Sequence, residues 1–151
     1  MGSAAHTFTS PGNRPLNIAL WVAQGLLALT FGFAGLPKLT TPIAQLAQQA
    51  PWVADLPWLV RFIGISEVLG AVGLILPAAT RVKPALTPLA AVGLLSIMVL
   101  AAAFHGYRGE WSFIGINVVL GGIAAFIAWG RFGRSRIEGR DAQLALQSST
   151  S

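Results

Sequence analysis

The sequence predicts an all-α integral membrane protein: an antiparallel four-helix bundle with a short interfacial helix between its first and second transmembrane helices. Hydrophobic residues make up 54% of the 151 positions and charged residues only 10%, and the mean hydropathy is +0.67. This composition lies far outside the balance of soluble domains. Four apolar stretches are each long enough to cross ~30 Å of hydrocarbon as a helix. The remaining segments are too short and polar to form a soluble domain.

The first predicted transmembrane helix covers residues 16–36 and follows a polar tail, residues 1–15, that has no apolar face to bury. This apolar stretch is longer than the core of a secretory signal, and no convincing small-x-small cleavage site follows it. We therefore expect a retained helix rather than a cleaved leader.

The connection after this helix is long enough to contain a short helix of its own. Thr41 is positioned to cap a helix whose first residue is Pro42 and which ends at Pro51. The apolar residues of this segment then share one face, which predicts a helix lying on the membrane surface.

The other three transmembrane helices are expected at residues 58–77, 85–106 and 112–130. The segments that join them, "AATRVKP" and "YRGEW", are short. Short links require neighbouring helices to run antiparallel. The membrane domain thus covers residues 16–132, and residues 133–151 form a second polar tail.

The distribution of Lys and Arg predicts the orientation in the membrane. The formal net charge of +5 would suggest a nucleic-acid partner in a soluble protein, but cytoplasmic loops of membrane proteins also collect basic residues, so we expect no nucleic acid. One side of the bundle would carry Arg14, Arg81, Lys83, Arg131, Arg134, Arg136 and Arg140, and the other side only Lys38, Arg61 and Arg108. We therefore expect a multi-pass protein of a bacterial-type inner membrane with both termini in the cytoplasm.

The polar residues within the apolar stretches gather in the outer half of the predicted bundle, where six of them fall at similar depth: Lys38, Arg61, Glu67, His105, Arg108 and Asn117. A charged group inside hydrocarbon costs at least ~2.5 to 3.5 kcal/mol, so Glu67 requires a partner, a cavity or a function. It shares a small-residue stripe with Gly64 and Ala71, which predicts that it points into the bundle. Arg61 lies about 240° away around the same helix and is expected to reach toward the lipid headgroups.

We therefore take Glu67 and His105 as candidate catalytic residues that handle protons, because histidine titrates near neutrality. Lys38, Arg61 and Asn117 are candidate ligand-binding residues. In the alternative, Glu67 is held by a structural hydrogen bond to His105 or Asn117, and the polar groups only join helices.

The sequence offers no thiol chemistry and only a weak signal for a metal or haem site. It contains no cysteine, which excludes disulfides, iron–sulfur ligation and thiol redox steps by this chain. His105 is the one histidine in an apolar stretch, so haem ligation by two histidines within the chain is excluded, whereas a single axial ligand stays open. Glu67 and His105 alone are a weak signal for a metal ion, and we expect no metal site.

Three segments carry a resemblance to a known family: "FGFAGLPKL" with Lys38, "RFIGISEVLGAVGLILP" with Arg61 and Glu67, and "AAAFH" ending in His105. Together they resemble the DoxX-like family of small four-helix membrane proteins, which includes the membrane subunit of thiosulfate:quinone oxidoreductase. The resemblance covers roughly residues 16–132. It implies the four-helix fold and an association with membrane redox chemistry around a quinone, without identifying a reaction.

Three functions remain open from the sequence. The first is a quinone-linked accessory subunit: a bundle with an outward-facing polar pocket that binds a lipophilic small molecule. Because no intrinsic flavin, haem or iron–sulfur motif is present, it would need a redox partner protein. The second is a cofactor-free enzyme that opens or isomerises an epoxide, with Glu67 as base or nucleophile and His105 as acid. The third is a structural anchoring subunit. A homo-oligomer is compatible with all three.

Overall fold

The computed structural model of the chain describes residues 14–140 and 148. This part of the chain is helical, as predicted, and four of its helices are long and apolar enough to span a membrane. The helices in chain order are α1 (Arg14–Thr40), α2 (Ile43–Gln49), α3 (Trp52–Asp55), α4 (Pro57–Thr80), α5 (Leu86–Tyr107) and α6 (Trp111–Phe132). The predicted tail at 1–15 lies outside the described residues except for Arg14 and Pro15, which begin α1.

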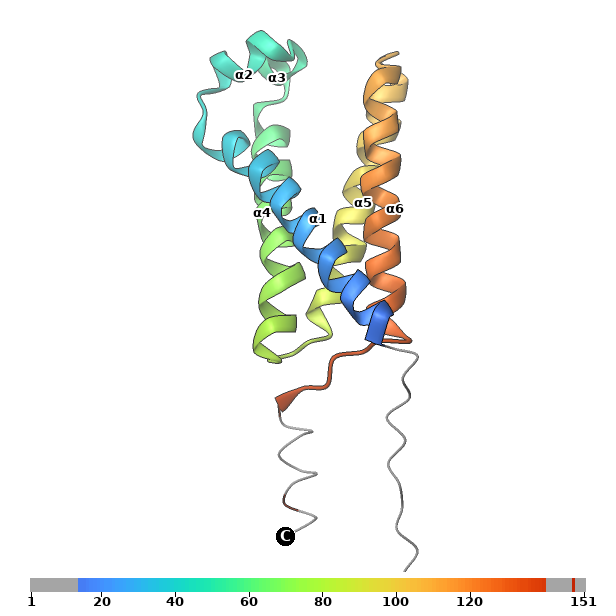
Figure 1. Cartoon of the computed structure of the whole chain (residues 1–151). Coiled ribbons are helices and arrows are strands. Elements are labelled where there is room, and N and C mark those ends of the chain that lie inside the picture. The colour runs from blue at the N-terminus through green and yellow to red at the C-terminus, as the bar shows by residue number, and fades with distance from the viewer. Residues whose placement is uncertain (1–13, 141–147, 149–151) are drawn as a thin grey trace, which may run out of the picture.

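The four long helices form a ring in which α1 packs on α4, α4 on α5, α5 on α6, and α6 returns to α1. Consecutive long helices alternate in direction (Figure 1). Helix α1 is tilted, so it meets α6 where α1 begins and diverges from α5 and α6 toward its own end (Figure 1). The bundle is therefore closed at one end and open at the other. We call these the basic end, where α1 begins and α6 ends, and the α3 end, where α2 and α3 lie.

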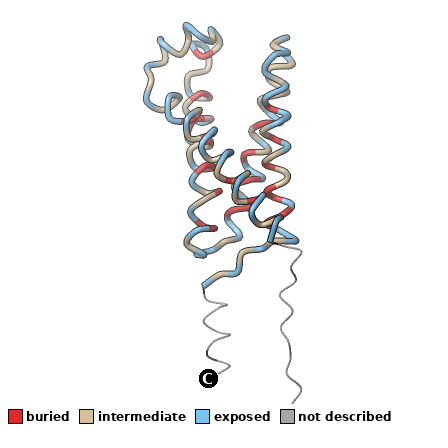
Figure 2. The backbone as a smooth tube through the Cα atoms, in the orientation of Figure 1, coloured by how far each residue is buried: buried red, intermediate tan, exposed pale blue. Residues whose placement is uncertain are grey.

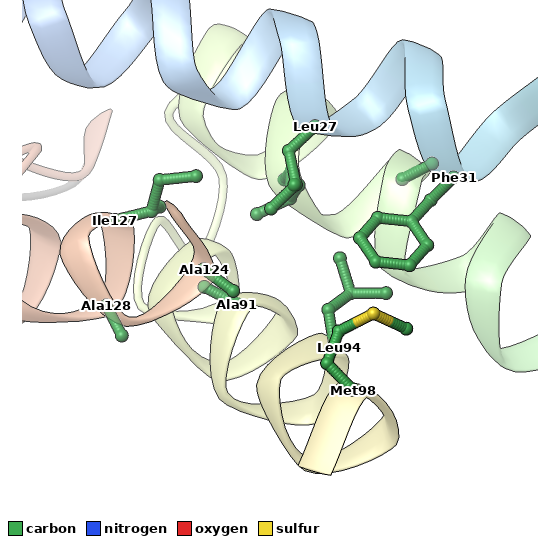
Figure 3. Packing of buried hydrophobic residues seen from close by; sticks show 10 residues of the cluster. Leu27, Phe31, Ala91, Leu94, Met98, Ala124, Ile127 and Ala128 are labelled. Carbon is green, nitrogen blue, oxygen red and sulfur yellow. The ribbon is translucent and has the colours of Figure 1, made fainter. Parts of the chain in front are cut away.

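The hydrophobic core fills the closed part of the bundle. Buried positions gather where the four helices converge (Figure 2). Leu27 and Phe31 of α1 point toward Leu94 and Met98 of α5, with Ile127 of α6 beside them (Figure 3). Phe31 and Met98 are the members of this cluster closest to the α3 end, so they close the core beneath the open part of the bundle.

Two glycines fix how closely the elements approach. A Cβ on Gly35 of α1 would lie 3.0 Å from the carbonyl oxygen of Gly64 on α4, and a Cβ on Gly64 would lie 3.1 Å from that of Gly35. The two backbones therefore cross in contact at this point, as small residues allow in membrane helices.

The turn between α5 and α6 depends on a further glycine. Gly109 adopts φ 73°, the left-handed conformation that glycine takes without strain.

The connection between α1 and α4 differs from the prediction. Helix α1 does not end at residue 36 but continues through Pro37 to Thr40. Pro42, rather than Thr41, is the N-cap residue of α2, and no side chain caps this helix. The chain then forms a second short helix, α3, after Pro51. That α2 lies on a membrane surface stays a prediction.

Candidate functional site

A cavity of about 370 Å³ occupies the open part of the bundle, between the α1–α4 pair and the α5–α6 pair. Small-molecule sites in proteins typically enclose ~300 to 1,000 Å³, so its volume is within that range. We call it the Glu67 cavity. Most of its wall is apolar, and each of the four long helices contributes one of its polar side chains: Lys38, Glu67, His105 and Asn117. The structure thus gathers four of the five predicted site residues, and their roles remain predictions.

Glu67 is held by Lys38. The Lys38 ammonium donates to both carboxylate oxygens of Glu67, at 2.7 Å and 3.0 Å, and to the backbone carbonyl of Ala34 at 3.1 Å. The Glu67 side chain is 6% exposed and that of Lys38 is 30% exposed. The alternative in which His105 or Asn117 holds Glu67 by a hydrogen bond was therefore wrong, because Lys38 is the partner. Lys38 reaches it because α1 runs one turn further than predicted and crosses α4 at Gly35 and Gly64.

Arg61 does not line the Glu67 cavity. Its guanidinium instead donates to the backbone carbonyls of Lys38 and, at 2.9 Å, of Thr41. The last carbonyls of a helix have no partner within that helix, so a basic side chain that donates hydrogen bonds to them stabilises its end. Arg61 thereby fixes the last turn of α1, from which Lys38 projects. The expectation that it reaches toward lipid headgroups was wrong.

His105 is part of a second charged group at the α3 end. Its Nδ1 lies 2.7 Å from Oε2 of Glu110, its ring stacks on Phe113 with centroids 4.9 Å apart, and Arg108 donates to the other oxygen of Glu110 at 2.8 Å. The sequence reasoning missed Glu110. The tight turn at Gly109 brings it back beside the end of α5, and a carboxylate five residues after the histidine was the signal that could have found it.

We expect the Glu110 interactions to stabilise the fold only above acidic pH. Hydrogen bonds from His105 and Arg108 hold the pKa of Glu110 below its ordinary value of 4.5. Because the folded state has the lower pKa, the stabilisation is complete above pH 4.5 and is lost as the pH falls through the folded-state pKa. The Glu110→Gln variant should melt below wild type at pH 7, and this difference should shrink in acid. A difference that is the same at both pH values would contradict this assignment.

Asn117 is the polar residue of the cavity without a partner. It is 7% exposed, it lines the Glu67 cavity, and its Nδ2 is buried with no hydrogen-bond acceptor among the described residues. A buried donor left without an acceptor costs about 1–3 kcal/mol. An acceptor on a ligand in this cavity would remove that cost.

An apolar groove of about 430 Å³ runs along α4 and α5 beside the cavity. The two hollows share Phe62, Ile97 and Leu100. Phe62 is 60% exposed and Leu100 is 70% exposed, so this wall faces the outside of the bundle. A molecule with a polar head and an apolar tail can occupy both hollows at once.

The basic end holds a polar cluster that the sequence reasoning also missed. Arg131 was counted as a charge of the cytoplasmic side, but it is 4% exposed. Its Nε donates to Gln24 at 2.6 Å and its Nη1 to Asn17 at 2.7 Å. Asn17 and Gln24 are seven residues apart and thus share one face of α1. This spacing of two polar residues could have predicted a polar cluster on that face.

One of three comparisons with known proteins identifies a family. A model of the DoxX-like family matches residues 22–127, a span that contains every polar residue of the Glu67 cavity. Searches of curated proteins and of solved structures give no match.

Proposed function

This chain belongs to the DoxX-like family, and from this premise we propose that it binds a lipophilic small molecule of the quinone class in the Glu67 cavity. In this proposal the chain is the quinone-binding subunit of a membrane redox system. A partner protein supplies or removes the electrons, because the chain has no cysteine and so no thiolate ligands for an iron–sulfur centre.

The observation that carries the proposal is the unpartnered Asn117 amide in a largely apolar cavity. A quinone has two carbonyl oxygens, which accept hydrogen bonds, on a flat apolar ring. Asn117 supports binding of one carbonyl, and the side chains of Lys38 and His105 are further donors on the same cavity wall. The apolar groove beside Phe62 and Leu100 would receive the tail.

Proton transfer in this proposal involves His105 and the Lys38–Glu67 pair. Reduction of a quinone carbonyl ends in a hydroxyl group, so a nearby group must deliver a proton to that oxygen. His105 is connected through Glu110 to the α3 end, which gives it a route for replacing its proton. The epoxide alternative is less well supported, because the Lys38 ammonium donates to both oxygens of Glu67 and stabilises the negative charge that a nucleophile must share with its substrate.

We also propose that the basic end faces the cytoplasm of a bacterial-type inner membrane. Seven of the ten Lys and Arg residues flank this end, where α1 begins, α4 meets α5 and α6 ends. Short basic segments are retained on the cytoplasmic side during insertion. The Glu67 cavity then opens in the outer half of the membrane.

The Asn117→Leu variant tests the proposed site. Leucine has nearly the same shape as asparagine but cannot donate, so the variant should retain about tenfold less ligand, the effect of one lost hydrogen bond of ~1.4 kcal/mol. Its stability without ligand should equal or exceed that of wild type, because an unsatisfied buried donor has been removed. Both proteins would be purified in native lipid discs and extracted with organic solvent, and the lipophilic molecules compared by mass spectrometry.

Ser112→Ala is the matched control, because it removes a polar group from an exposed position in the first turn of the same helix. It should retain the ligand of wild type. Identical bulk-lipid profiles in all three proteins would contradict the proposal and favour an anchoring subunit. Turnover of an epoxide by the purified chain alone would favour the acid–base enzyme.

A further inference from the structure

The buried Arg131 guanidinium has no anionic partner among the residues that the structure describes. Its nitrogens Nε and Nη1 donate to neutral acceptors: Gln24, Asn17 and, at 3.1 Å, the backbone carbonyl of Ser135. Its Nη2 is buried without any acceptor, and the guanidinium lies over the ring of Trp21 at 5.4 Å. The ion pairs found in the described part of the chain all lie at the α3 end. Arg131 therefore places an uncompensated positive charge inside the basic end.

Such a charge is costly in a membrane protein unless an anion lies nearby. The side chains around it are also basic. A cavity of about 460 Å³ adjoins Asn17 and Ser135, the residues that hold Arg131, and its wall carries four arginines, Arg14, Arg81, Arg134 and Arg136. We call it the basic cavity. Among the described residues of its wall, Glu138 is the one carboxylate, so positive charge is in excess among them.

The neighbouring hollow extends the same charged region. It has a volume of about 450 Å³, and Arg131 itself lines it together with Arg136 and Glu138. The basic cavity lies where α1 begins, where α4 ends at Arg81, and where the chain leaves α6. Basic pockets between the ends of transmembrane helices have the charge and depth that suit the head group of an anionic lipid.

We propose that the basic cavity is a binding site for a phosphate group. Guanidinium groups present planar pairs of N–H donors that match phosphate oxygens, and several of them together favour an anion with more oxygens than a carboxylate. The phosphate would also lie close enough to Arg131 to offset its buried charge. Its source is either the head group of an anionic phospholipid or a free phosphate compound. This site is separate from the Glu67 cavity and does not depend on the function proposed for that cavity.

The test compares two double variants that remove the same charge from the same end. Arg14→Gln/Arg136→Gln removes two exposed arginines from the cavity wall, and Lys83→Gln/Arg140→Gln removes two basic residues outside it. The purified full chain in a neutral detergent would be titrated with three probes: inorganic phosphate, short-chain phosphatidylglycerol, and diacylglycerol of the same chain length. Binding is measured as the concentration-dependent rise in melting temperature, at constant ionic strength adjusted with chloride.

We expect saturable stabilisation of wild type by phosphatidylglycerol and none by diacylglycerol. The cavity variant should bind at least about tenfold more weakly, the effect of losing charge-assisted hydrogen bonds, and the control variant within about twofold of wild type. Stabilisation by phosphatidylglycerol alone identifies a lipid head group, and stabilisation by inorganic phosphate as well identifies a site for free phosphate. No stabilisation of wild type, or equal weakening of both variants, would overturn the proposal.

Discussion

Replacing Lys38 with methionine is expected to lower the free energy of unfolding by about 3–5 kcal/mol, the cost of leaving one member of a buried ion pair alone. The Glu67 side chain is only 6% exposed, and Lys38 is its one charged hydrogen-bond partner among the described residues. The Glu67→Leu variant should be less damaging. The Lys38 side chain is 30% exposed and is long enough to turn its ammonium toward water or lipid headgroups.

The double variant Lys38→Met/Glu67→Leu separates the structural role of the pair from its role in binding. Apolar residues of similar volume often replace a buried ion pair at little net cost. We therefore expect the double variant to unfold close to wild type in titrations with a denaturing detergent, and to lose the bound ligand. A double variant that keeps the ligand would remove this pair from the proposed site. Additive losses of stability would show that the two side chains do not interact.

The sequence was sufficient to predict the bundle because the bilayer sets a minimum length for each helix. Each of the four apolar stretches became a helix, and each helix extends at least a residue beyond its predicted end on one side or both. Counting depth along these helices placed six polar residues at a similar depth. Lys38, Glu67, His105 and Asn117 line one cavity in the structure, whereas Arg61 and Arg108 do not line it.

The ion pair between Lys38 and Glu67 could not be predicted, because it depends on how far α1 continues and where α1 crosses α4. The predicted helix ended with its apolar stretch at residue 36, whereas the bonds from Arg61 to the carbonyls of Lys38 and Thr41 support one more turn. The burial of the Arg131 side chain could not be predicted for a similar reason. A basic residue at the end of an apolar stretch is typical of a membrane boundary. Its burial follows from the close contact between α1 and α6, where a Cβ on Gly130 would meet Leu20 at 2.6 Å.

Adding one methyl group at Gly35 is expected to destabilise the protein by about 1–3 kcal/mol, the usual cost of overpacking. In the Gly35→Ala variant the new Cβ would lie 2.9 Å from Val68 and 3.0 Å from both Glu67 Cβ and the Gly64 carbonyl oxygen. One of these atoms belongs to the backbone, so α1 and α4 must separate. Separation lengthens the Lys38–Glu67 contact, and we therefore expect reduced ligand retention as well as a lower unfolding free energy.

Gly32→Ala is the matched control, one turn earlier on α1, where a new Cβ meets nothing within 4 Å. It should be neutral or stabilising by up to about 0.5–1 kcal/mol, because alanine loses less backbone freedom than glycine in a helix.

Gly64→Ala should separate the same two helices from the α4 side, since its Cβ would lie 2.9 Å from Lys38 Cβ. Once one substitution has separated the helices, the second costs less, so the Gly35→Ala/Gly64→Ala variant should lose less stability than the sum of the single variants. Fully additive losses, or an equal effect at Gly32, would show that the crossing does not fix the geometry of the ion pair.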